Sequence, residues 1–449
     1  MIVPSPDPMP ARFVSSDQLR GDRPVVWPDP LYGSVRLASW AASLLATPPF
    51  ARLAGISLSD VPGEWLFGGS FPSRLDHARG VYHLARLARP RDRALQAASL
   101  AHDLGHGPFS HISEPLMRAR WRCDHEERAA RQLAAVRSAL SASARRRLEW
   151  LDWDEVSALV LGHGTDARGA LLNGQLDFDN MDHVARFRLA AGLGQPGYNP
   201  VELARALRAL PVDHAAAIQG GALGAPLALV YLLPQAKEAA LAWQTARQEV
   251  YGFLHEHHRN LAPHAMLRRM IELAAIEDTL PPNFLDMTDD AALDCLAGNI
   301  HQGVAMLGQR VRAGAAAWHV CHWEAELPPE AAETLLRGSW QRRAELEAKL
   351  ADEAGLAPQD VIVEVLISAA GRSLPPISSS GKPDGFLWLP VPHSTPPIAH
   401  LLVTAGTPRD YAHRLRTAAE RHLGALGAIP RAFTARRRES SCDESRTSR

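Results

Sequence analysis

The chain has 449 residues, of which 46% are hydrophobic and 22% are charged, so it is long enough for one large domain and a smaller one. Its 48 basic and 49 acidic residues give a formal net charge of −1, which excludes a general electrostatic attraction to nucleic acids or anionic membranes. Four scattered cysteines without a CxxC pair and the lack of a membrane-length apolar run predict a soluble protein of the reducing cytoplasm.

The first predicted elements are an extended arm and a series of helices. Residues 1–28 contain six prolines and little periodicity, which predicts an arm without regular structure. Apolar residues recur at helical spacing through Leu75–Ala101 with a break at Arg89-Pro90, which predicts two consecutive helices. Further helices are predicted at Glu126–Ala142, Trp153–Val160, Leu176–Ala191 and Val201–Leu210.

A short hairpin and two long helices follow. Ala215–Ile218 and Leu227–Leu233 are separated by a glycine-rich stretch, which predicts a pair of strands. Long helices are predicted at Ala236–His257 and Pro263–Ile276. We therefore predict a mainly α fold in which residues 29–313 form a helical core domain with one short β-hairpin.

The sequence changes character after about residue 314. Glu330–Leu356 has the pattern of a charged amphipathic helix, and Val361–Ser368 alternates and is rich in β-branched residues, which predicts a strand. Two weaker strands and a closing helix are predicted at Gly385–Pro390, Ala399–Val403 and Arg409–Leu426. These elements predict a smaller α+β C-terminal lobe over residues 314–430, followed by a polar, disordered tail over residues 431–449.

The pattern that carries chemistry is centred on His102-Asp103 at the end of an apolar helix. Gly105 lets the next turn approach closely, so both side chains can point into one cavity. His77 and Asp179, each at the start of another predicted helix, provide further ligands for a divalent ion such as Mn²⁺, Mg²⁺, Fe²⁺ or Zn²⁺. Two imidazoles and two carboxylates leave about two positions on an octahedral ion for a phosphate oxygen and water, which favours phosphate-ester hydrolysis.

Several blocks of the sequence together resemble one family. In chain order they are DPLYGSV (29–35), TPPFARL (47–53), RLDHARGVYHLARL (74–87), SLAHDLGHGPFSHISE (99–114) and DHEERAA (124–130). They are similar to motifs of the HD-superfamily phosphohydrolases, and more narrowly of the deoxynucleoside triphosphate triphosphohydrolase (dGTPase-like) branch. The resemblance covers roughly Asp29 to Asp290, and the HDxGHGPFSH run is its most specific part.

The resemblance implies a set of site residues. The metal ligands would be His77, His102, Asp103 and Asp179, and the catalytic residues His106, His111, Glu114, His125 and Glu126. Histidine transfers protons near neutral pH, so we expect His125, oriented by Glu126, to protonate the departing 5′-oxygen. His106 would contact the phosphate, and His111 with Glu114 would position the water.

The resemblance also suggests residues that bind the substrate. These candidates are Arg74, Arg247, His183 and His255. Arg247 matches an arginine that contacts the polyphosphate tail in the family, because its spacing to Tyr251 and His255 is similar. Arg186 is a further candidate for binding a phosphate or a carboxylate.

Several positions depart from the family pattern around the substrate. Asn180 replaces a basic residue, His183 replaces a tyrosine, and Phe187 stands where a sugar-contacting aspartate is usual. Leu58-Ser59 aligns with a Gln-Leu pair that senses the 2′-position. Because each change removes a polar contact, the sequence supports hydrolysis better than it supports deoxynucleotide specificity.

Three functions remain open at this point. The first is a metal-dependent hydrolase that releases triphosphate from (deoxy)nucleoside triphosphates, and the second is an HD hydrolase of another nucleotide or phosphate ester. The third is a non-catalytic regulator that binds nucleotides or nucleic acid. Arg436–Arg438 could provide a weak nucleic-acid contact, and a homo-oligomer is expected from the resemblance only.

Overall fold

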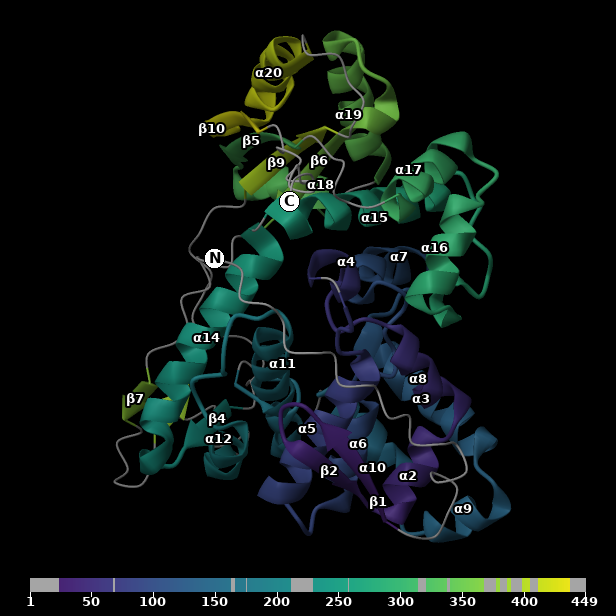
Figure 1. Cartoon of the computed structure of the whole chain (residues 1–449), viewed down its shortest axis with the longest axis vertical. Coiled ribbons are helices and arrows are strands. Elements are labelled where there is room, and N and C mark those ends of the chain that lie inside the picture. The colour runs from purple at the N-terminus through teal and green to yellow at the C-terminus, as the bar shows by residue number, and fades with distance from the viewer. Residues whose placement is uncertain are drawn as a thin grey trace, which may run out of the picture. The chain divides into compact units, whose positions relative to one another are not determined.

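The computed structural model contains two compact units that interleave along the chain. The residues it describes are 24–67, 69–162, 166–174, 176–210, 229–256, 258–313, 320–336, 340–366, 377–379, 386–388, 398–403 and 411–436. The first unit consists of Met1–Leu254, Pro281–Ala292 and Arg372–His393, and the second of His255–Leu280, Leu293–Gly371 and Ser394–Arg449. Helices dominate the fold (Figure 1), so the predicted mainly α class is confirmed.

The first unit is a helical core with two small sheets. Its helices are α2 (Ser39–Leu45), α3 (Pro48–Arg52), α4 (Gly63–Phe67), α5 (Arg74–Ala88), α6 (Arg93–Ala101), α7 (Glu114–Leu116), α8 (His125–Ala139), α9 (Ala142–Arg147), α10 (Trp153–Leu161), α11 (Phe178–Ala190), α12 (Pro200–Ala206) and most of α14 (Lys237–Glu256). The antiparallel pair β1 (Val25–Asp29) and β2 (Gly33–Leu37) begins the described chain, although an arm without regular structure was expected over residues 1–28. Residues 1–23 of that arm lie outside the described residues.

The helix pair α5–α6 has clear local causes in the sequence. Ser73 and Asp76 form a reciprocal capping box at the start of α5. Pro90 cannot continue α5, and Asp92 caps the first turn of α6 by accepting a hydrogen bond from Leu95 N at 2.9 Å. The two helices pack against each other, which confirms the predicted break at Arg89-Pro90.

A second small sheet differs from the prediction. The helix predicted at Val201–Leu210 ends at Ala206, and β3 (Leu207–Leu210) pairs instead with β4 (Leu229–Leu232) in antiparallel register. Tertiary pairing therefore overrides the helical pattern over these four residues. The strand expected at Ala215–Ile218 lies outside the described residues.

This sheet also takes in strands that are distant in sequence. Its order is β3-β4-β8-β7, with β8 at Phe386–Trp388 and β7 at Ile377–Ser379. The strand predicted at Gly385–Pro390 thus forms, but it belongs to the first unit and not to the C-terminal lobe in which we expected it.

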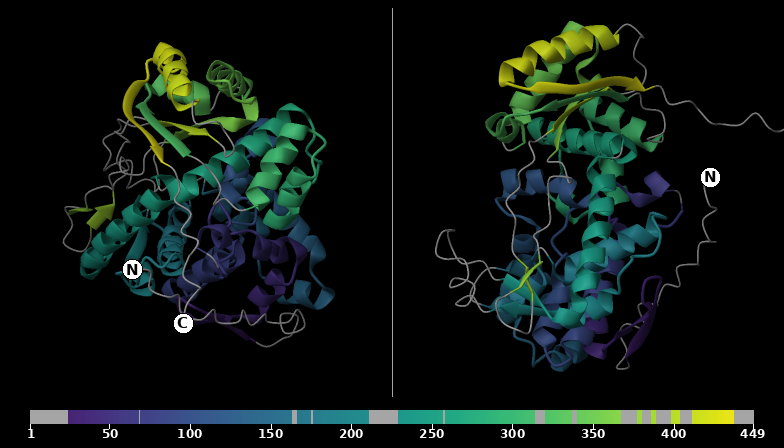
Figure 2. Two further views of the ribbon diagram at one scale, coloured as in Figure 1. Left: turned by 45° about the horizontal axis from the view of Figure 1, so that its top comes forward. Right: turned by 90° about the vertical axis from the view of Figure 1, so that its left-hand side faces the viewer.

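The second unit combines helices with a four-stranded antiparallel sheet. Its helices are α15 (His258–Ile276), most of α16 (Asp289–Ala297), α17 (Gln302–Arg312), α18 (Pro329–Leu336), α19 (Trp340–Ala354) and α20 (Tyr411–His422). The sheet has the order β10-β5-β9-β6, with β5 at Val320–Glu326, β6 at Val361–Leu366, β9 at Ile398–Val403 and β10 at Ile429–Arg436. Helices α19 and α20 pack on each other and on this sheet (Figure 2).

Three details of the second unit differ from the sequence analysis. The single helix expected at Glu330–Leu356 is two helices, α18 and α19. Strand β5 was not predicted, and β10 continues to Arg436, within the segment 431–449 that was expected to be a disordered tail. The predicted boundary at residue 314 falls inside the second unit.

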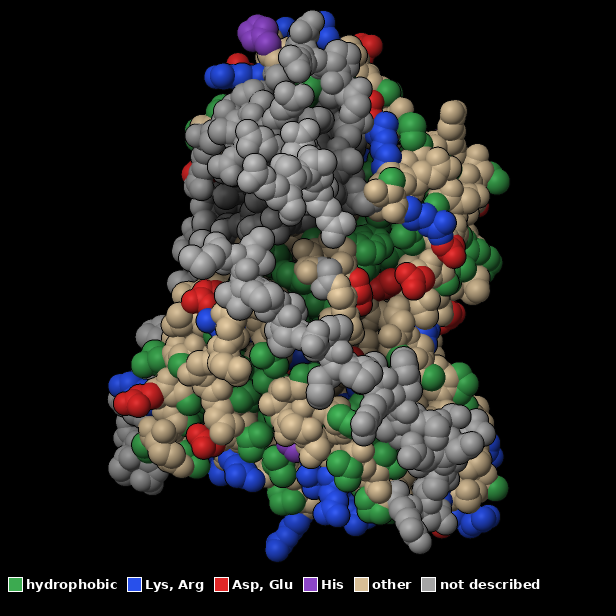
Figure 3. Space-filling model, in the orientation of Figure 1, with side chains coloured by type: hydrophobic (Ala, Val, Ile, Leu, Met, Phe, Trp, Pro, Cys, Tyr) green, Lys and Arg blue, Asp and Glu red, His purple; other side chains and the backbone are tan. Residues whose placement is uncertain are grey.

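The surface agrees with the balanced composition. On the face drawn in Figure 3, basic and acidic side chains are both present among hydrophobic and neutral ones. In the part of the chain that the structure describes, we find no helix with the length and apolar character needed to cross a membrane.

Candidate metal centre and its histidine cluster

Three helices of the first unit bring a set of metal-binding side chains together. His77 lies in the first turn of α5, His102 directly follows α6, and Asp179 lies in the first turn of α11. The Nε2 atoms of His77 and His102 are 3.3 Å apart, and His77 Nε2 is 2.8 Å from Asp179 Oδ1. One ligand atom from each of the three residues lies within 4.8 Å of the others, which is close enough for one ion.

Asp103 lies beside these three residues. Its Oδ1 is 3.4 Å from His102 Nε2, and its Oδ2 is 3.7 Å from His77 Nε2. The Arg74 guanidinium donates a 2.9 Å hydrogen bond to Asp103 Oδ2. The four predicted metal ligands are therefore neighbours, and two imidazoles with two carboxylates fit a divalent cation.

A residue that the sequence analysis did not select orients His77. Asp182 Oδ2 lies 2.8 Å from His77 Nδ1, so the other ring nitrogen, Nε2, faces Asp179 and His102. A carboxylate behind a histidine ligand fixes the ring and its tautomer. The signal was present, because Asp182 lies three residues after Asp179 on the same helix.

Arg186 supports this carboxylate. Its Nε and Nη2 atoms donate to the two oxygens of Asp182 at 2.8 and 2.9 Å, and its Nη1 lies 3.0 Å from Asp29 Oδ2. Tyr32 donates its hydroxyl to Asp182 Oδ1 at 2.7 Å. We expected Arg186 to bind a phosphate or a carboxylate. In the structure it is buried and its partners are carboxylates.

The acidic groups of the site stabilise positive charge at His77. Burial alone lowers the pKa of His77, but hydrogen bonds with Asp179 and Asp182 outweigh it and raise that pKa to about 9. Burial raises the pKa of Asp182, but the Arg186 charge and the His77 hydrogen bond outweigh it and hold that pKa below its usual range. The Asp103 and Asp179 carboxyls also have lowered pKa values, so all three carboxylates are ionised at neutral pH.

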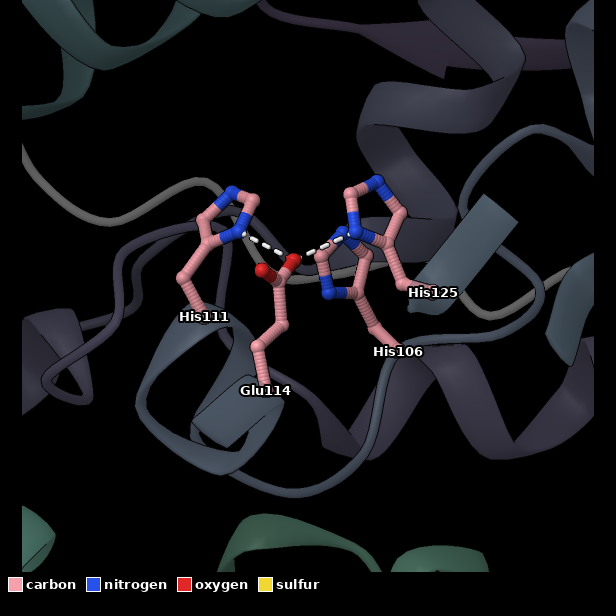
Figure 4. A group of neighbouring side chains, drawn as sticks. All are labelled: His106, His111, Glu114 and His125. Carbon is pink, nitrogen blue, oxygen red and sulfur yellow. Dashed lines mark hydrogen bonds and ion pairs between the residues drawn. The ribbon is translucent and has the colours of Figure 1, made fainter. Parts of the chain in front are cut away.

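Figure 4 shows a second cluster, made of His106, His111, Glu114 and His125. His111 lies in a single 3-10 turn, Glu114 begins α7, and His125 begins α8. His111 Nδ1 lies 2.8 Å from Glu114 Oε1, and His125 Nδ1 is hydrogen-bonded to the same oxygen. Glu126 Oε2 is 3.3 Å from His125 Nδ1, so two carboxylates lie near this imidazole.

The histidines of this cluster have different proton affinities. Partial burial lowers the pKa of His111, but the charge of Glu114 outweighs it and raises the pKa to about 9. Burial, together with the charges of Arg74 and His125, lowers the pKa of His106 well below its usual range. The His106 ring stacks on the His125 ring with 4.1 Å between centroids. The cluster therefore contains both an imidazole that holds its proton and one that stays neutral.

A strained loop links the two groups. Phe109 and Ser110 have φ values of 58° and 51°, a region that L-residues rarely adopt. Asp289 accepts hydrogen bonds from Phe109 N at 2.7 Å and Ser57 N at 2.8 Å, so it stabilises this loop conformation. The sequence analysis did not select Asp289.

Gly105 allows the close packing that was expected of it. A Cβ at this position would overlap the backbone carbonyl of His125 in the first turn of α8. The glycine therefore lets α8 lie directly against the loop that follows His102-Asp103.

The substrate-binding candidates occupy different environments. Arg74 is buried and hydrogen-bonded to Asp103 and Ser110 Oγ. The Arg247 guanidinium lies 4.2 Å from the Tyr251 ring centroid, a cation–π geometry. The side chain of His255 lies outside the described residues.

His183 connects the metal ligands to an aromatic group. Its ring centroid is 5.9 Å from that of His77 and 6.1 Å from that of Tyr251, and it stacks on Phe187 at 6.2 Å. Phe187 in turn contacts Phe67, Phe71 and Phe253. Burial and the charge of His77 lower the pKa of His183 to about 3, so it is neutral at physiological pH.

The remaining positions that depart from the family pattern have partners within the protein or are buried. Leu58 and Ser59 are buried. The Asn180 amide donates to both carboxylate oxygens of Asp177 at 3.1 and 3.2 Å and accepts the Tyr251 hydroxyl at 3.3 Å. Leu58 and Ser59 therefore lie in the interior of the first unit, and the amide of half-buried Asn180 is paired with protein groups.

Comparisons with known proteins agree with this picture. Residues 74–206 match the model of the HD domain family. Over 128 residues the chain is 31% identical to deoxynucleoside triphosphate triphosphohydrolase SAMHD1 of Homo sapiens, which covers 24% of this chain and 20% of that protein. It is 28% identical over 199 residues to the uncharacterized protein YwfO of Bacillus subtilis (strain 168), covering 41% of this chain and 44% of that protein.

The matches cover part of the chain and part of each relative. Residues 74–206 contain helices α5–α12 and all four predicted metal ligands, and this segment matches the HD domain family. The resemblance to dGTPase-like phosphohydrolases of the HD superfamily is confirmed. The matched region spans about a fifth of the length of the SAMHD1 proteins, at 20% for both the Homo sapiens and the Bos taurus sequences.

Proposed function

We propose that this chain is a metal-dependent phosphohydrolase that acts on nucleotides. The observation that carries the proposal is the adjacency of two groups. His77, His102, Asp103 and Asp179 offer the donor set of a divalent ion, and a histidine–glutamate cluster lies directly beside them. His106 Nε2 in that cluster is only 3.1 Å from Asp103 Oδ1.

The ligand set supports a resident divalent ion, for which Mn²⁺, Mg²⁺, Fe²⁺ and Zn²⁺ are the candidates. When bound, such an ion polarises a phosphoryl oxygen and acidifies a water molecule. Asp182 holds the His77 ring so that Nε2 faces the ligand group, and Arg74 holds Asp103 in place. The chain's own contribution is therefore a held set of ligands, in which His77, His102 and Asp103 are buried and Asp179 is partly exposed.

The second cluster supplies proton transfer in this proposal. His125, paired with Glu114 and close to Glu126, donates a proton to the departing oxygen of the ester. His111 shares Glu114 and is half exposed, so this pair positions water at the open side of the site. Neutral, buried His106 contacts the phosphate.

The substrate that we favour is a (deoxy)nucleoside triphosphate, which is cleaved to nucleoside and triphosphate. The similarity to SAMHD1 proteins, which carry that activity in their name, supports this choice. Arg247 is the candidate for the polyphosphate chain, and His183 and His255 for the remainder of the substrate. We also propose that the protein is cytoplasmic. We further propose that it forms homo-oligomers, which sedimentation velocity of the purified chain would test.

A product assay tests this function. Purified protein with Mn²⁺ or Mg²⁺ is incubated with a panel of dNTPs and NTPs, and the products are separated by anion exchange. We expect nucleoside and inorganic triphosphate in equal amounts. Release of no product from any of these nucleotides would rule out the triphosphohydrolase activity.

A second candidate is hydrolysis of a different phosphate ester. It is favoured by Phe187, because this ring is fully buried against three other phenylalanine rings and offers a sugar no polar contact. Modified, cyclic and oligonucleotide phosphates are the substrates to try. Turnover of one of them, with none of any triphosphate, would select this alternative.

A further inference from the structure

The cluster in Figure 4 has the composition of a metal site in its own right. His106, His111, Glu114 and His125 each place one nitrogen or oxygen atom within 4.8 Å of the others. These side chains come from three successive short segments and the start of α8, which the close contact at Gly105 holds together. This group shares none of its members with the His77, His102 and Asp179 group.

The internal contacts of the cluster converge on one point. The Nδ1 atoms of His111 and His125 both bind the same carboxylate oxygen, Glu114 Oε1. Two imidazoles that share one carboxylate oxygen need only small rotations to place both nitrogens and the oxygen around one ion. Such an ion would replace the protons that lie between Glu114 and the two imidazoles.

His106 gives an independent sign that a partner is missing from the cluster. Its side chain is fully buried, and within the described part of the chain neither ring nitrogen has a hydrogen-bond partner. Its Nε2 is 3.1 Å from Asp103 Oδ1, but the two atoms lack hydrogen-bond geometry. Because buried polar groups are normally satisfied, this imidazole is suited to bind something that enters the cluster.

The donor set decides which ion fits. Three imidazoles and one carboxylate are typical of Zn²⁺ and similar transition metals, whereas Mg²⁺ prefers oxygen ligands and retains its water. The cluster is also accessible, because the His111 side chain is 48% exposed while those of Glu114 and His125 are 15% and 16% exposed. A dissolved ion can therefore reach it.

We propose that His111, Glu114 and His125, with His106 behind them, form a second binding site for a transition-metal ion such as Zn²⁺, and that this ion inhibits the enzyme. Inhibition follows because a metal bound at His125 Nδ1 prevents that imidazole from carrying the second proton that a general acid needs. The inhibitory part rests on the proposed function, whereas the binding part does not.

Binding is measured first, without any substrate. Metal-free full-length protein is titrated with Zn²⁺ in a calorimeter, and the bound metal is counted by mass spectrometry after desalting. We expect two ions per wild-type chain, one in the double variant H111A/H125A and one in His102→Ala. Exposed His413 in α20 is a matched control, and His413→Ala should retain two.

H111A/H125A could lose metal because it misfolds, so a second variant of the same cluster is needed. Glu114→Gln keeps the size of the side chain but removes the charge, and we expect it to lower Zn²⁺ affinity at the second site at least tenfold. Circular dichroism then shows whether each variant is folded. A single ion in the wild-type chain, or two ions retained in both H111A/H125A and Glu114→Gln, would overturn the second site.

Inhibition is tested on wild-type protein loaded with Mn²⁺. We expect added Zn²⁺ to lower kcat at least tenfold while electron paramagnetic resonance detects no release of bound Mn²⁺. If the loss of turnover instead follows Mn²⁺ release, or if saturating Zn²⁺ leaves kcat unchanged, the inhibitory role is wrong. Two bound ions without hydrolysis of any phosphate ester would contradict the proposed function and leave the second site standing.

Discussion

His77 shows how residues other than the four candidate metal ligands orient a ligand side chain. Its Nδ1 is bound to Asp182, which Arg186 and Tyr32 hold in turn, and Arg186 also pairs with Asp29. Asp29 accepts hydrogen bonds from the backbone N–H groups of Leu31 and Tyr32, which ties the N-terminal DPLYGSV block to the same network. The block therefore contributes to the metal centre through support rather than through direct ligation.

This support can be tested with Asp182→Asn. The amide keeps the shape of the side chain but no longer provides a charged acceptor for His77 Nδ1, and it weakens the pair with Arg186. We expect Mn²⁺ affinity to fall about 10- to 100-fold, as is usual for such partners of metal-binding histidines. Calorimetry measures this, with exposed Asp154→Asn in α10 as the control that should bind Mn²⁺ normally.

Asp289 makes a prediction about pH. Burial raises the pKa of this carboxyl to about 7, even though the N–H groups of Phe109 and Ser57 lower it. The unfolded chain loses this proton near its usual pKa of about 4, so the folded state holds more protons between about pH 4 and pH 7. The contribution of Asp289 to stability is therefore complete below about pH 4 and is lost as the pH rises through 7.

The comparison is made with Asp289→Asn, which cannot ionise. Urea unfolding of both proteins at about pH 5 and pH 8 should show that the wild-type protein loses more stability than the variant as the pH rises. Parallel changes in the two proteins would show that Asp289 does not titrate as the structure indicates.

At the scale of elements, close contacts set the position of α8. Helix α8 approaches the loop after His102-Asp103 only because Gly105 has no side chain. Arg128 of α8 reinforces the contact, since its NH1 donates to Gly105 O at 2.8 Å. The first turn of α8 contains His125, so the position of this proposed general acid depends on the helix contact.

Gly105→Ala tests that dependence. Its Cβ would overlap the His125 carbonyl, so α8 must shift, and a displacement near 1 Å is enough to cost about 100-fold in rate. We expect kcat to fall by at least tenfold and the Tm to drop. Gly424→Ala is the control, because a Cβ there meets nothing within 4 Å and should leave both values unchanged.

The elements show which parts of the fold a sequence can predict. Helices with caps and long apolar stripes, such as α5 and α6, were predicted within one or two residues because Ser73, Pro90 and Asp92 set their ends locally. Strands β3 and β5 were missed because their pairing depends on partners distant in the chain, which no local pattern reveals.

The same distinction applies to the site. The residues of the metal group lie in motifs with recognisable order, so the family resemblance was sufficient to select them. Asp182 and Asp289 act through distant partners, His77 and the backbone of Phe109 and Ser57. The position of Asp182, three residues after Asp179 on α11, was a local sign of its role, but Asp289 has no comparable sign. Sequence reasoning therefore selected the candidate ligands better than the residues that support them.

At the scale of the whole molecule, the second unit has a buried charge network of its own. Arg268 on α15 donates to Glu364 on β6 and to Glu272, each at 2.7 Å, and Arg269 lies 2.9 Å from Glu347 on α19. These groups are almost completely buried. The network ties helices to the sheet within this unit and includes none of the residues that we assign to the site.

Removing one partner should therefore destabilise the second unit without changing the site. We expect Glu364→Ala to lower the free energy of unfolding by about 3–5 kcal/mol, the range seen when a buried charge loses its partner. Denaturant unfolding measures this loss, and Mn²⁺ affinity of the folded protein should stay at the wild-type value. A weakened metal affinity would show that the two units are energetically coupled.

The central claim is that the His77–His102–Asp103–Asp179 group binds an ion that the hydrolysis requires. The most direct measurement combines Mn²⁺ binding with product analysis on wild-type protein and Asp103→Asn, using ³¹P NMR to identify the phosphate released. We predict one Mn²⁺ site and inorganic triphosphate from the wild-type protein, and the loss of both in the variant. Undiminished hydrolysis by Asp103→Asn, or hydrolysis by wild-type protein kept free of metal with a chelator, would contradict it.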